Sequence, residues 1–188
     1  AWITATFRAG TDVSNSQLKE WRAIVHSVRA NYNEDAGRVV ESSYFNQEMN
    51  TDFFLTFNKS LGEKFKINAI LGHNFNQRQV RNQSAQVIGL NIPEFYQLSN
   101  SSSTPTVDEF SSKRRLTGVY GSLDFSFKDY LFLTASARND WSSTLPESNR
   151  SFFYPSINLS FLISDAFPSI QKFLPYAKIR AGYAQTGN

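Results

Sequence analysis

Carboxylate pairs are the side chains of this sequence that could support bond-breaking chemistry. Asp108 with Glu109, and Asp140 with Glu147, have the composition of a glycosidase acid and base. All four residues fall in or beside polar stretches, where solvated carboxylates are the ordinary state of Asp and Glu. We therefore interpret them as solvated loop carboxylates, with a glycoside hydrolase as a distant alternative.

Histidine and cysteine, the other common carriers of catalysis and metal binding, are scarce. The sequence has two histidines, His26 and His73, and no cysteine. Without cysteine there can be no disulfide, zinc–thiolate site, iron–sulfur cluster or cysteine nucleophile. The sequence also lacks a phosphate-binding loop, a Gly-x-Ser-x-Gly motif and a metal-spaced cluster. The prediction is a protein that is not an enzyme and has no catalytic residue, cofactor or metal site.

Four charged residues near the C-terminal end recur at alternate positions: Arg138, Asp140, Lys178 and Arg180. Alternate residues of a strand point to the same face, so Arg138 shares a face with Asp140 and Lys178 shares one with Arg180. We predict that they line a wet interior and pair with one another or with another part of the protein. Contact with a passing substrate is the alternative role.

The composition excludes several classes of protein. The 188 residues include 17 Phe, 8 Tyr and 3 Trp, far more aromatic carbon than a disordered chain carries. The longest apolar run has only four residues, Tyr130 to Leu133, whereas a membrane-spanning helix needs about 20. The net charge of +3, without a dense basic block, gives nucleic-acid binding little support.

In several segments of the chain, apolar residues recur at every second position. Leu123 and Phe125, for example, alternate with Ser122, Asp124 and Ser126. This alternation predicts strands with one apolar and one polar face, over residues 1–8, 43–58, 64–78, 115–127, 130–141, 150–163 and 175–186. Two architectures fit the pattern: an antiparallel sandwich whose apolar faces meet, or a membrane barrel whose apolar faces meet lipid.

The connections between these strands alternate strictly between short and long. Short turns are predicted at Lys128-Asp129, 59–63 and 164–174, the last with about one helical turn, and long polar stretches at 9–42, 79–114 and 142–149. Outer-membrane barrels have short periplasmic turns and long outer loops, whereas sandwiches rarely carry loops of 30 residues. The alternation favours the barrel and predicts that the long stretches lie outside the cell.

Both of the longest connections contain structured-looking segments. Ser14-Asn-Ser-Gln17 resembles a capping box, and Leu18, Trp21, Val25 and Val28 follow at helical spacing, which predicts a short amphipathic surface helix. In the other connection, Phe95 and Tyr96 are candidates for stacking on a substrate or contacting a partner. Packing within the loop is the more common role for such rings.

Motifs in the C-terminal part resemble those of a transporter family. Arg138-Asn-Asp-Trp-Ser-Ser-Thr-Leu-Pro146 precedes Asn149-Arg-Ser-Phe-Phe-Tyr-Pro-Ser156, and Tyr176-Ala-Lys-Ile-Arg-Ala-Gly-Tyr-Ala-Gln-Thr-Gly-Asn188 follows. In order and spacing they are similar to the barrel signatures of SusC/RagA-type TonB-dependent outer-membrane transporters. The similarity is most specific over residues 115–188.

The resemblance implies a segment of a larger barrel in the cell outer membrane, with roughly 22 strands around a plug. Such a protein imports glycans or peptides with a SusD-type surface lipoprotein, using energy from a TonB complex, and outer-membrane lipid contacts its apolar faces. Seven strands are too few and odd in number for a single-chain bacterial barrel. We expect the plug, the TonB box and the final strands to belong to a longer polypeptide. The alternative function is that of a soluble β-sandwich carbohydrate-binding module.

Overall fold

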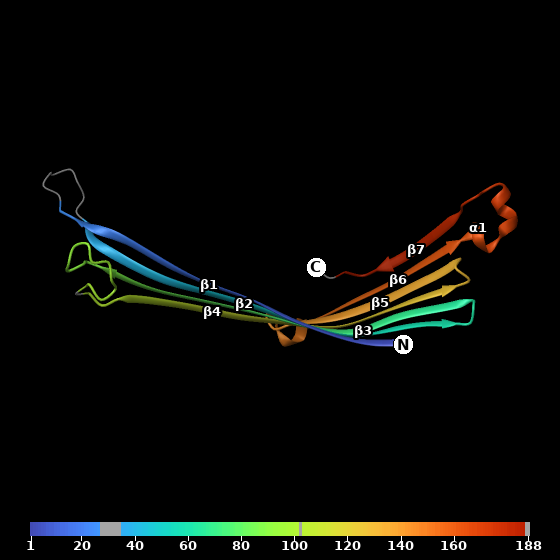
Figure 1. Cartoon of the computed structure of the whole chain (residues 1–188), viewed down its shortest axis with the longest axis horizontal. Helices are drawn as coiled ribbons and strands as arrows, with labels where there is room; N and C mark the ends of the chain where they lie inside the picture. The colour runs from blue at the N-terminus through green and yellow to red at the C-terminus, as the bar shows by residue number, and fades with distance from the viewer. Residues whose placement is uncertain (27–34, 102, 187–188) are drawn as a thin grey trace. The chain divides into compact units, whose positions relative to one another are not determined.

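The computed structural model describes residues 1–26, 35–101 and 103–186. They form one sheet of seven strands that neighbour one another in chain order (Figure 1). The strands are β1 (Ile3–Val25), β2 (Asp35–Leu61), β3 (Phe65–Ile88), β4 (Thr106–Phe127), β5 (Leu131–Ser142), β6 (Ser151–Leu162) and β7 (Lys178–Ala184). The described residues do not form the second sheet that a β-sandwich requires.

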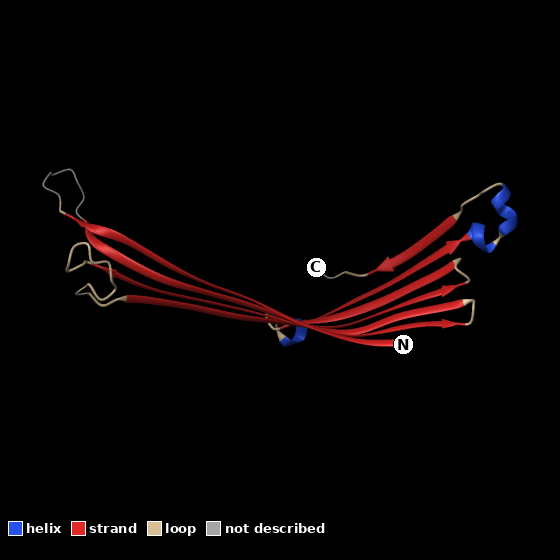
Figure 2. Cartoon of the chain, viewed as in Figure 1, coloured by secondary structure: helices blue, strands red, loops and turns tan. Residues whose placement is uncertain are grey.

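Among the described residues, helix occurs only in connections between strands (Figure 2). α1 (Ile163–Ala166) and η2 (Pro168–Lys172) lie between β6 and β7, where about one helical turn is predicted, and η1 (Glu147–Asn149) lies between β5 and β6. In the part of the chain that the structure describes, no helix has the length and apolar composition to cross a bilayer.

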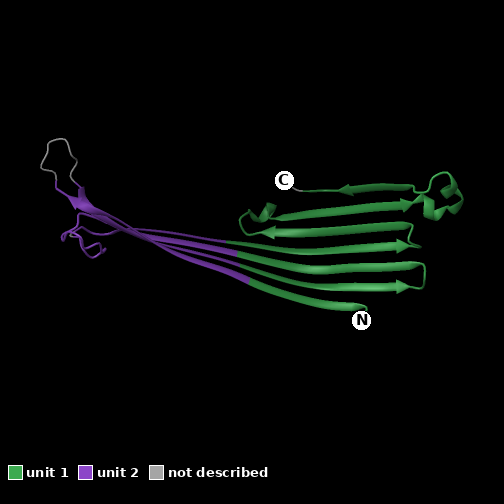
Figure 3. Ribbon diagram, turned by 45° about the horizontal axis from the view of Figure 1, so that its top comes forward, with its two compact units in different colours: residues 1–10, 49–77, 114–188 green, residues 11–48, 78–113 purple. Residues whose placement is uncertain are grey.

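The chain divides into two compact units (Figure 3). Unit 1 comprises residues 1–10, 49–77 and 114–188, and unit 2 comprises residues 11–48 and 78–113. β5 and β6, at 12 residues each, lie wholly in unit 1, whereas β1 to β4, at 22 to 27 residues, contribute to both units. About 9–11 tilted residues cross a bilayer, so β5 and β6 have the length of membrane-spanning strands and β1 to β4 are twice as long.

The register in unit 1 confirms the alternation read from the sequence. Leu123 pairs with Ala135, Ala135 with Ile157 on β6, and Ile157 with Tyr183 on β7. Two residues further along each strand, apolar residues again lie opposite apolar residues. One face of the sheet therefore collects the apolar side chains, and these are 42–63% exposed at Val119, Leu123, Phe153, Ile157, Leu159, Ile179 and Tyr183. A bare apolar face of this extent is expected of a surface that meets lipid rather than water.

The turn between β4 and β5 is one residue longer than the sequence predicts, since residues 128–130 separate the paired Phe127 and Leu131. Lys128 and Asp129 both have positive φ, at 47° and 57°, and the amide of Tyr130 donates to the carbonyl of Phe127 at 3.2 Å. Two consecutive positive φ values define a type I′ turn, whose twist matches that of the two strands it joins. The turn fixes the register in which Phe127 faces Leu131.

Unit 2 corrects the interpretation of the two longest connections. Residues 14–25, predicted as a helix, belong to β1, and most of 79–114 belongs to β3 and β4. The helix prediction is therefore wrong over these residues, and Val28 lies outside the described residues. The helical spacing of Leu18 and Trp21 does not produce a helix because β1 pairs along its length with β2, whose backbone groups satisfy its hydrogen bonds.

A small core in unit 2 forms where the β3–β4 connection packs against the sheet. Val39 and Val87 are almost completely buried, Leu90 is 8% exposed, and Ile24, Tyr96 and Leu98 pack around them. The buried Asn100 side chain holds the connection together. Its amide donates to the carbonyls of Ile92 and Phe95, and its oxygen accepts from the amide of Ile92.

Candidate functional site

The polar face of the unit 1 sheet collects side chains from every strand that crosses it. On this face Thr134 donates to Asp124 at 2.6 Å, and Ser136 lies 2.7 Å from Ser156 across the strands. Farther along the sheet, Asn74 donates to Asp52 at 2.7 Å. Such a face offers hydrogen bonds to water and to polar solutes, which are the properties of a barrel's interior wall.

Arg138 and Asp140 form an ion pair on this face, near the end of β5. Nε of Arg138 lies 2.8 Å from both carboxylate oxygens of Asp140. The guanidinium also lies over the ring of Tyr120, 5.5 Å from its centroid. The structure therefore brings together two of the charged residues predicted to meet, and adds an aromatic partner from β4.

Two glycines provide the space for this cluster. Gly118 is the β4 residue opposite Asp140, and any Cβ there would overlap the Arg138 and Asp140 side chains. A Cβ at Gly72 on β3 would overlap the ring of Tyr120 in the same way. The ion pair and the ring thus lie flat against the sheet because the backbone beneath them carries no side chain.

Lys178 and Arg180 share the polar face but do not join the ion pair. The register places them opposite Leu162 and Ser160, next to the α1–η2 connection, whereas Arg138 is opposite Tyr154 towards the other end of β6. The sequence predicts the common face but does not show that the two pairs lie at opposite ends of it.

The two candidate aromatic residues of the β3–β4 connection differ in their surroundings. Tyr96 packs against Trp21 with ring centroids 5.5 Å apart and borders the core of unit 2. Phe95, its neighbour, is 46% exposed and uses only its backbone carbonyl to hold the connection. Tyr96 is thus packed within the fold, and Phe95 is the ring available for contacts with another molecule.

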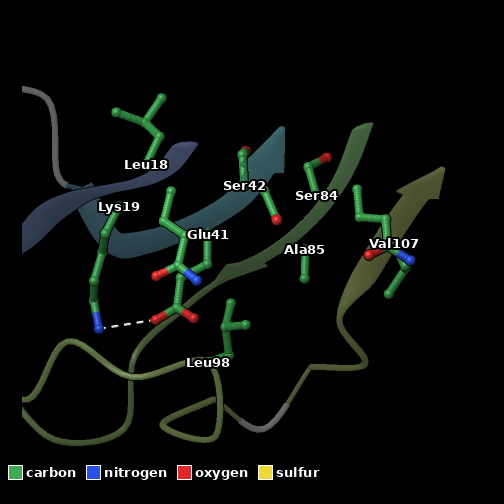
Figure 4. Close-up of a pocket in the computed structure, with 11 residues that line it drawn as sticks. Leu18, Lys19, Glu41, Ser42, Ser84, Ala85, Leu98 and Val107 are labelled. Carbon is green, nitrogen blue, oxygen red and sulfur yellow. Dashed lines mark ion pairs between the residues drawn. The ribbon is translucent and has the colours of Figure 1, made fainter. Parts of the chain in front are cut away.

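A hollow of about 710 Å³ lies beside this core (Figure 4). Lys19 and Glu41, an ion pair at 2.8 Å, line it together with Leu98 of the connection, Ala85 of β3 and Val107 of β4. Both ends of the ion pair are partly exposed, and serine and glutamine side chains complete the lining. The hollow thus combines an ion pair and uncharged polar side chains with apolar walls.

Comparison with known proteins agrees with this geometry. The family model described as TonB dependent receptor-like, beta-barrel, matches residues 2–188, nearly the whole chain. The chain belongs to the TonB-dependent receptor β-barrel family. It is 30% identical over 156 residues to TonB-dependent receptor P26 of Formosa agariphila, and 25% identical over 138 residues to receptor P39 of the same organism. These alignments cover 80% and 72% of the chain but only 15% and 13% of the two receptors.

Solved structures of the RagAB peptide transporter have the same fold. One matches 99% of the chain with a TM-score of 0.81 at 20% identity, and the closed-closed state of the RagAB peptide importer matches with a TM-score of 0.82 at 21% identity. The chain covers 21% of each of those chains. The resemblance to SusC/RagA-type barrels is confirmed in the fold, and the chain spans about a fifth of the length of the RagAB chains that it matches.

In this TonB-dependent receptor barrel the candidate carboxylates and histidines do not come together in a catalytic or metal-binding arrangement among the described residues. Asp108 and Glu109 are adjacent on β4, so they point to opposite faces and cannot act together. Glu147 pairs with Arg150 at 3.5 Å, away from Asp140. Nε2 of His73 lies 2.9 Å from the Thr117 hydroxyl. His26 is exposed, and no group of three metal-ligating side chains occurs among the described residues.

The residues that sequence reasoning missed are Gly72, Gly118 and Tyr120. Gly118 and Tyr120 neighbour the ion pair, and Gly72 neighbours the Tyr120 ring, only through the pairing of β3, β4 and β5. The sequence did contain one signal for the two glycines. Both occupy positions on the polar face of their strands, where the other positions carry larger side chains, and a glycine there leaves space for a neighbouring side chain. The register was needed to show which side chains fill the space above them.

Proposed function

We propose that this chain forms part of the wall of an outer-membrane importer that takes up glycans or peptides with energy from a TonB complex. The observation that carries the proposal is the division of the unit 1 sheet into an exposed apolar face and a hydrogen-bonded polar face, in a chain of the receptor barrel family. A wall of this kind separates lipid from a wet lumen. In that arrangement Arg138, Asp140, Lys178 and Arg180 line the lumen.

Arg138 and Asp140 are proposed to shape the lumen wall rather than to bind substrate. Their charges are already matched to each other, and Tyr120 covers one side of the guanidinium. Arg180 at the other end is exposed, and no described residue forms an ion pair with it. Arg180 is the better candidate of the four for contact with a plug or with a substrate.

Unit 2 is proposed to lie outside the cell and to form part of the contact with a SusD-type surface lipoprotein. Its strands continue beyond the length a bilayer needs, and the exposed Phe95 and the hollow beside Leu98 provide surfaces for contact. The solved structures whose fold this chain shares are those of the RagAB peptide transporter, and the resemblance to SusC/RagA-type barrels implies the lipoprotein partner. By the same orientation, the short connections of unit 1 lie in the periplasm.

Uptake by cells tests the import proposal directly. A strain lacking the full-length receptor is supplied with defined glycans or peptides as the sole nutrient, with and without a functional TonB complex. Growth that requires both the receptor and TonB on one nutrient class would identify that class. Unchanged growth of the deletion strain on every class would contradict the import role.

Cysteine labelling tests the orientation, and the chain has no native cysteine to interfere. Ser99→Cys in unit 2 and Ser60→Cys near the β2–β3 turn, both exposed positions, are introduced singly into the full-length protein. An impermeant maleimide applied to intact cells should label position 99 only. Labelling at position 60 alone would invert the topology and remove the proposed lipoprotein contact.

A further inference from the structure

Lysine and arginine are segregated along this chain. Of its eight lysines, six belong to unit 1, and all six lie on or beside the short connections: Lys59, Lys64, Lys66, Lys128, Lys172 and Lys178. Of its eleven arginines, only Arg180 lies there. Lys66 and Lys178 lie on the polar face of the sheet. We call the surface formed by the other four, Lys59, Lys64, Lys128 and Lys172, the lysine rim.

Backbone contacts place the short connections along one edge of unit 1. The amide of Lys128 donates to the carbonyl of Lys64 at 2.7 Å, which joins the β4–β5 turn to the β2–β3 turn. The amide of Leu162 donates to the carbonyl of Tyr130 at 2.8 Å, which joins the same turn to the end of β6. Figure 3 shows these connections at the same edge of the unit 1 sheet.

A continuous row of aromatic rings borders the lysine rim. Successive centroids lie 4.8 to 6.4 Å apart along Phe65, Phe127, Tyr130, Phe161 and Phe167. Aromatic girdles of this kind lie at the boundary between hydrocarbon and headgroups. The lysine rim therefore lies at headgroup level, just beyond the end of the apolar face.

The rim lysines are placed to reach phosphate groups. Nζ of Lys128 lies 5.4 Å from the ring centroid of Phe127, and Nζ of Lys59 lies 5.6 Å from that of Trp2. Each ammonium thus lies over an aromatic ring while its side chain remains exposed. A lysine ammonium has three rotatable donors on a flexible stem, which suits binding to mobile phosphodiesters.

The connection between β6 and β7 adds exposed apolar side chains to the same surface. Phe173 is 87% exposed and Tyr176 is 66% exposed, and Lys172 directly precedes Phe173. Basic residues combined with exposed apolar side chains are typical of segments that lie in a membrane interface. This connection therefore has the composition of an interfacial anchor.

The charge balance of the edge favours an anionic partner. The four rim lysines lie beside only three carboxylates in the same connections, Glu63, Asp129 and Asp165. One of these carboxylates, Asp129, is already paired with Lys66 at 2.7 Å. The excess positive charge is concentrated where the aromatic row places the headgroups.

We propose that the lysine rim binds the phosphodiester headgroups of anionic phospholipids and anchors this edge of the barrel in the bilayer. The inference rests on the outer-membrane location of the barrel, and its assignment to the inner leaflet rests on the orientation proposed above. A protein or a soluble anion bound at this edge would be a different outcome of the test.

Lipid retention by the full-length receptor tests the proposal. The protein is purified from mixed micelles with equal amounts of phosphatidylglycerol and phosphatidylcholine, and the lipids that remain bound are counted by native mass spectrometry. The test variant is K59Q/K64Q/K128Q/K172Q. The control variant, R38Q/R78Q/R81Q/K113Q, removes the same charge from unit 2.

The wild-type protein should retain phosphatidylglycerol in preference to phosphatidylcholine, and the test variant should lose this preference by about tenfold or more, since each lysine near a bilayer adds several-fold to the affinity. The control variant should keep the preference within about twofold, since its removed charges lie outside the rim. A four-fold Lys→Arg variant at the rim, which keeps the charges, should retain most of it. Heat-dependent migration on gels verifies that each variant is a folded barrel.

Two further measurements keep the result independent of any single variant. About 1 M salt should abolish the preference of the wild-type protein, because it reduces the screening length to about 3 Å. Millimolar inorganic phosphate should compete poorly with the lipid, because it lacks the acyl chains that hold the headgroup at the rim. Equal preference in the wild-type and test variants, or full competition by inorganic phosphate, would overturn the proposal.

These measurements are made without transport, so loss of the import function would leave their outcome unchanged. Inverted cysteine labelling would move the rim to the other leaflet but would not remove the lipid preference. A protein captured at the rim in place of lipid, with no phosphatidylglycerol preference in the purified receptor, would also contradict the proposal.

Discussion

β1 to β4 contribute to both units, but the distribution of apolar side chains along these strands differs between unit 1 and unit 2. In unit 1, β3 begins with Phe65, Ile67 and Leu71 on one face and polar residues on the other. In unit 2 the same strand reads Asn-Gln-Ser-Ala-Gln over residues 82–86, with almost no apolar side chain on either face until Val87. The strand continues through both units without interruption.

The difference shows that pairing and burial are separate requirements for a strand. Unit 1 needs an apolar face because lipid is its solvent on one side. Unit 2 needs only its backbone ladder and one small core, because an established hairpin can extend while both faces meet water. The apolar side chains of unit 2 are concentrated where the β3–β4 connection covers Val39 and Val87.

The largest expected difference between the units comes from placing a charge on matched exposed positions. Ile157 in unit 1 is 48% exposed and Tyr44 in unit 2 is 44% exposed. Ile157→Arg should cost about 2–4 kcal/mol of folding free energy in lipid, because a charge near the midplane loses its hydration. Tyr44→Arg, in water, should change stability by less than about 0.5 kcal/mol.

Folding titrations of the full-length barrel into lipid vesicles measure both values. Ser126→Arg on the polar face serves as the control within unit 1 and should be tolerated. Similar penalties at positions 157 and 44 would remove the distinction between a lipid-facing and a water-facing unit.

A second comparison uses glycines with positive φ in the two units. Gly62 has φ of +67° with open space around it, whereas Gly37 has φ of +78° and a Cβ there would lie 2.9 Å from Leu90. Gly62→Ala should cost about 1 kcal/mol from backbone strain alone. Gly37→Ala should cost about 2–3 kcal/mol, because Leu90 must also move.

Hydrogen exchange of the reconstituted receptor locates these effects. Gly37→Ala should accelerate exchange in the β3–β4 connection and leave β5 and β6 protected. Equal effects of the two substitutions would show that Leu90 does not pack against Gly37 in solution.

A third comparison removes the same atoms from a buried and an exposed valine. Val87→Ala should destabilise unit 2 by about 1–2 kcal/mol, because it deletes two buried methyl groups and leaves a cavity. Val119→Ala in unit 1 should cost less, because lipid fills the space left on an exposed apolar face. Proteolysis of the β3–β4 connection reports the first effect, and the reverse order of sensitivity would contradict the assignment of the core.

The smallest expected difference is between the ion pairs of the two units. Arg138–Asp140 makes two 2.8 Å contacts through one nitrogen, and Lys19–Glu41 makes one 2.8 Å contact with both side chains about 40% exposed. Double-mutant cycles should give a coupling of about 1 kcal/mol for the first pair and about 0.2–0.5 kcal/mol for the second. A larger coupling at Lys19–Glu41 than at Arg138–Asp140 would contradict this order.

The sequence by itself determined the strands of unit 1, their faces and their turns. The alternation of Leu123 and Phe125 with Ser122 and Asp124 assigns each side chain to a face without reference to any partner strand. Lys128-Asp129 could be recognised as a turn because it separates two alternating segments by two residues. These features are local, so a single strand or turn is enough to show them.

Only the tertiary structure decided the course of unit 2 and the neighbours of the ion pair. Residues 14–25 carry a helix-like pattern, yet the pairing with β2 makes them strand, because backbone hydrogen bonds to a neighbour do not depend on side-chain type. The recesses at Gly72 and Gly118 depend on which residues lie opposite one another. Register is a relation between strands distant in sequence, and one strand's own pattern does not contain it.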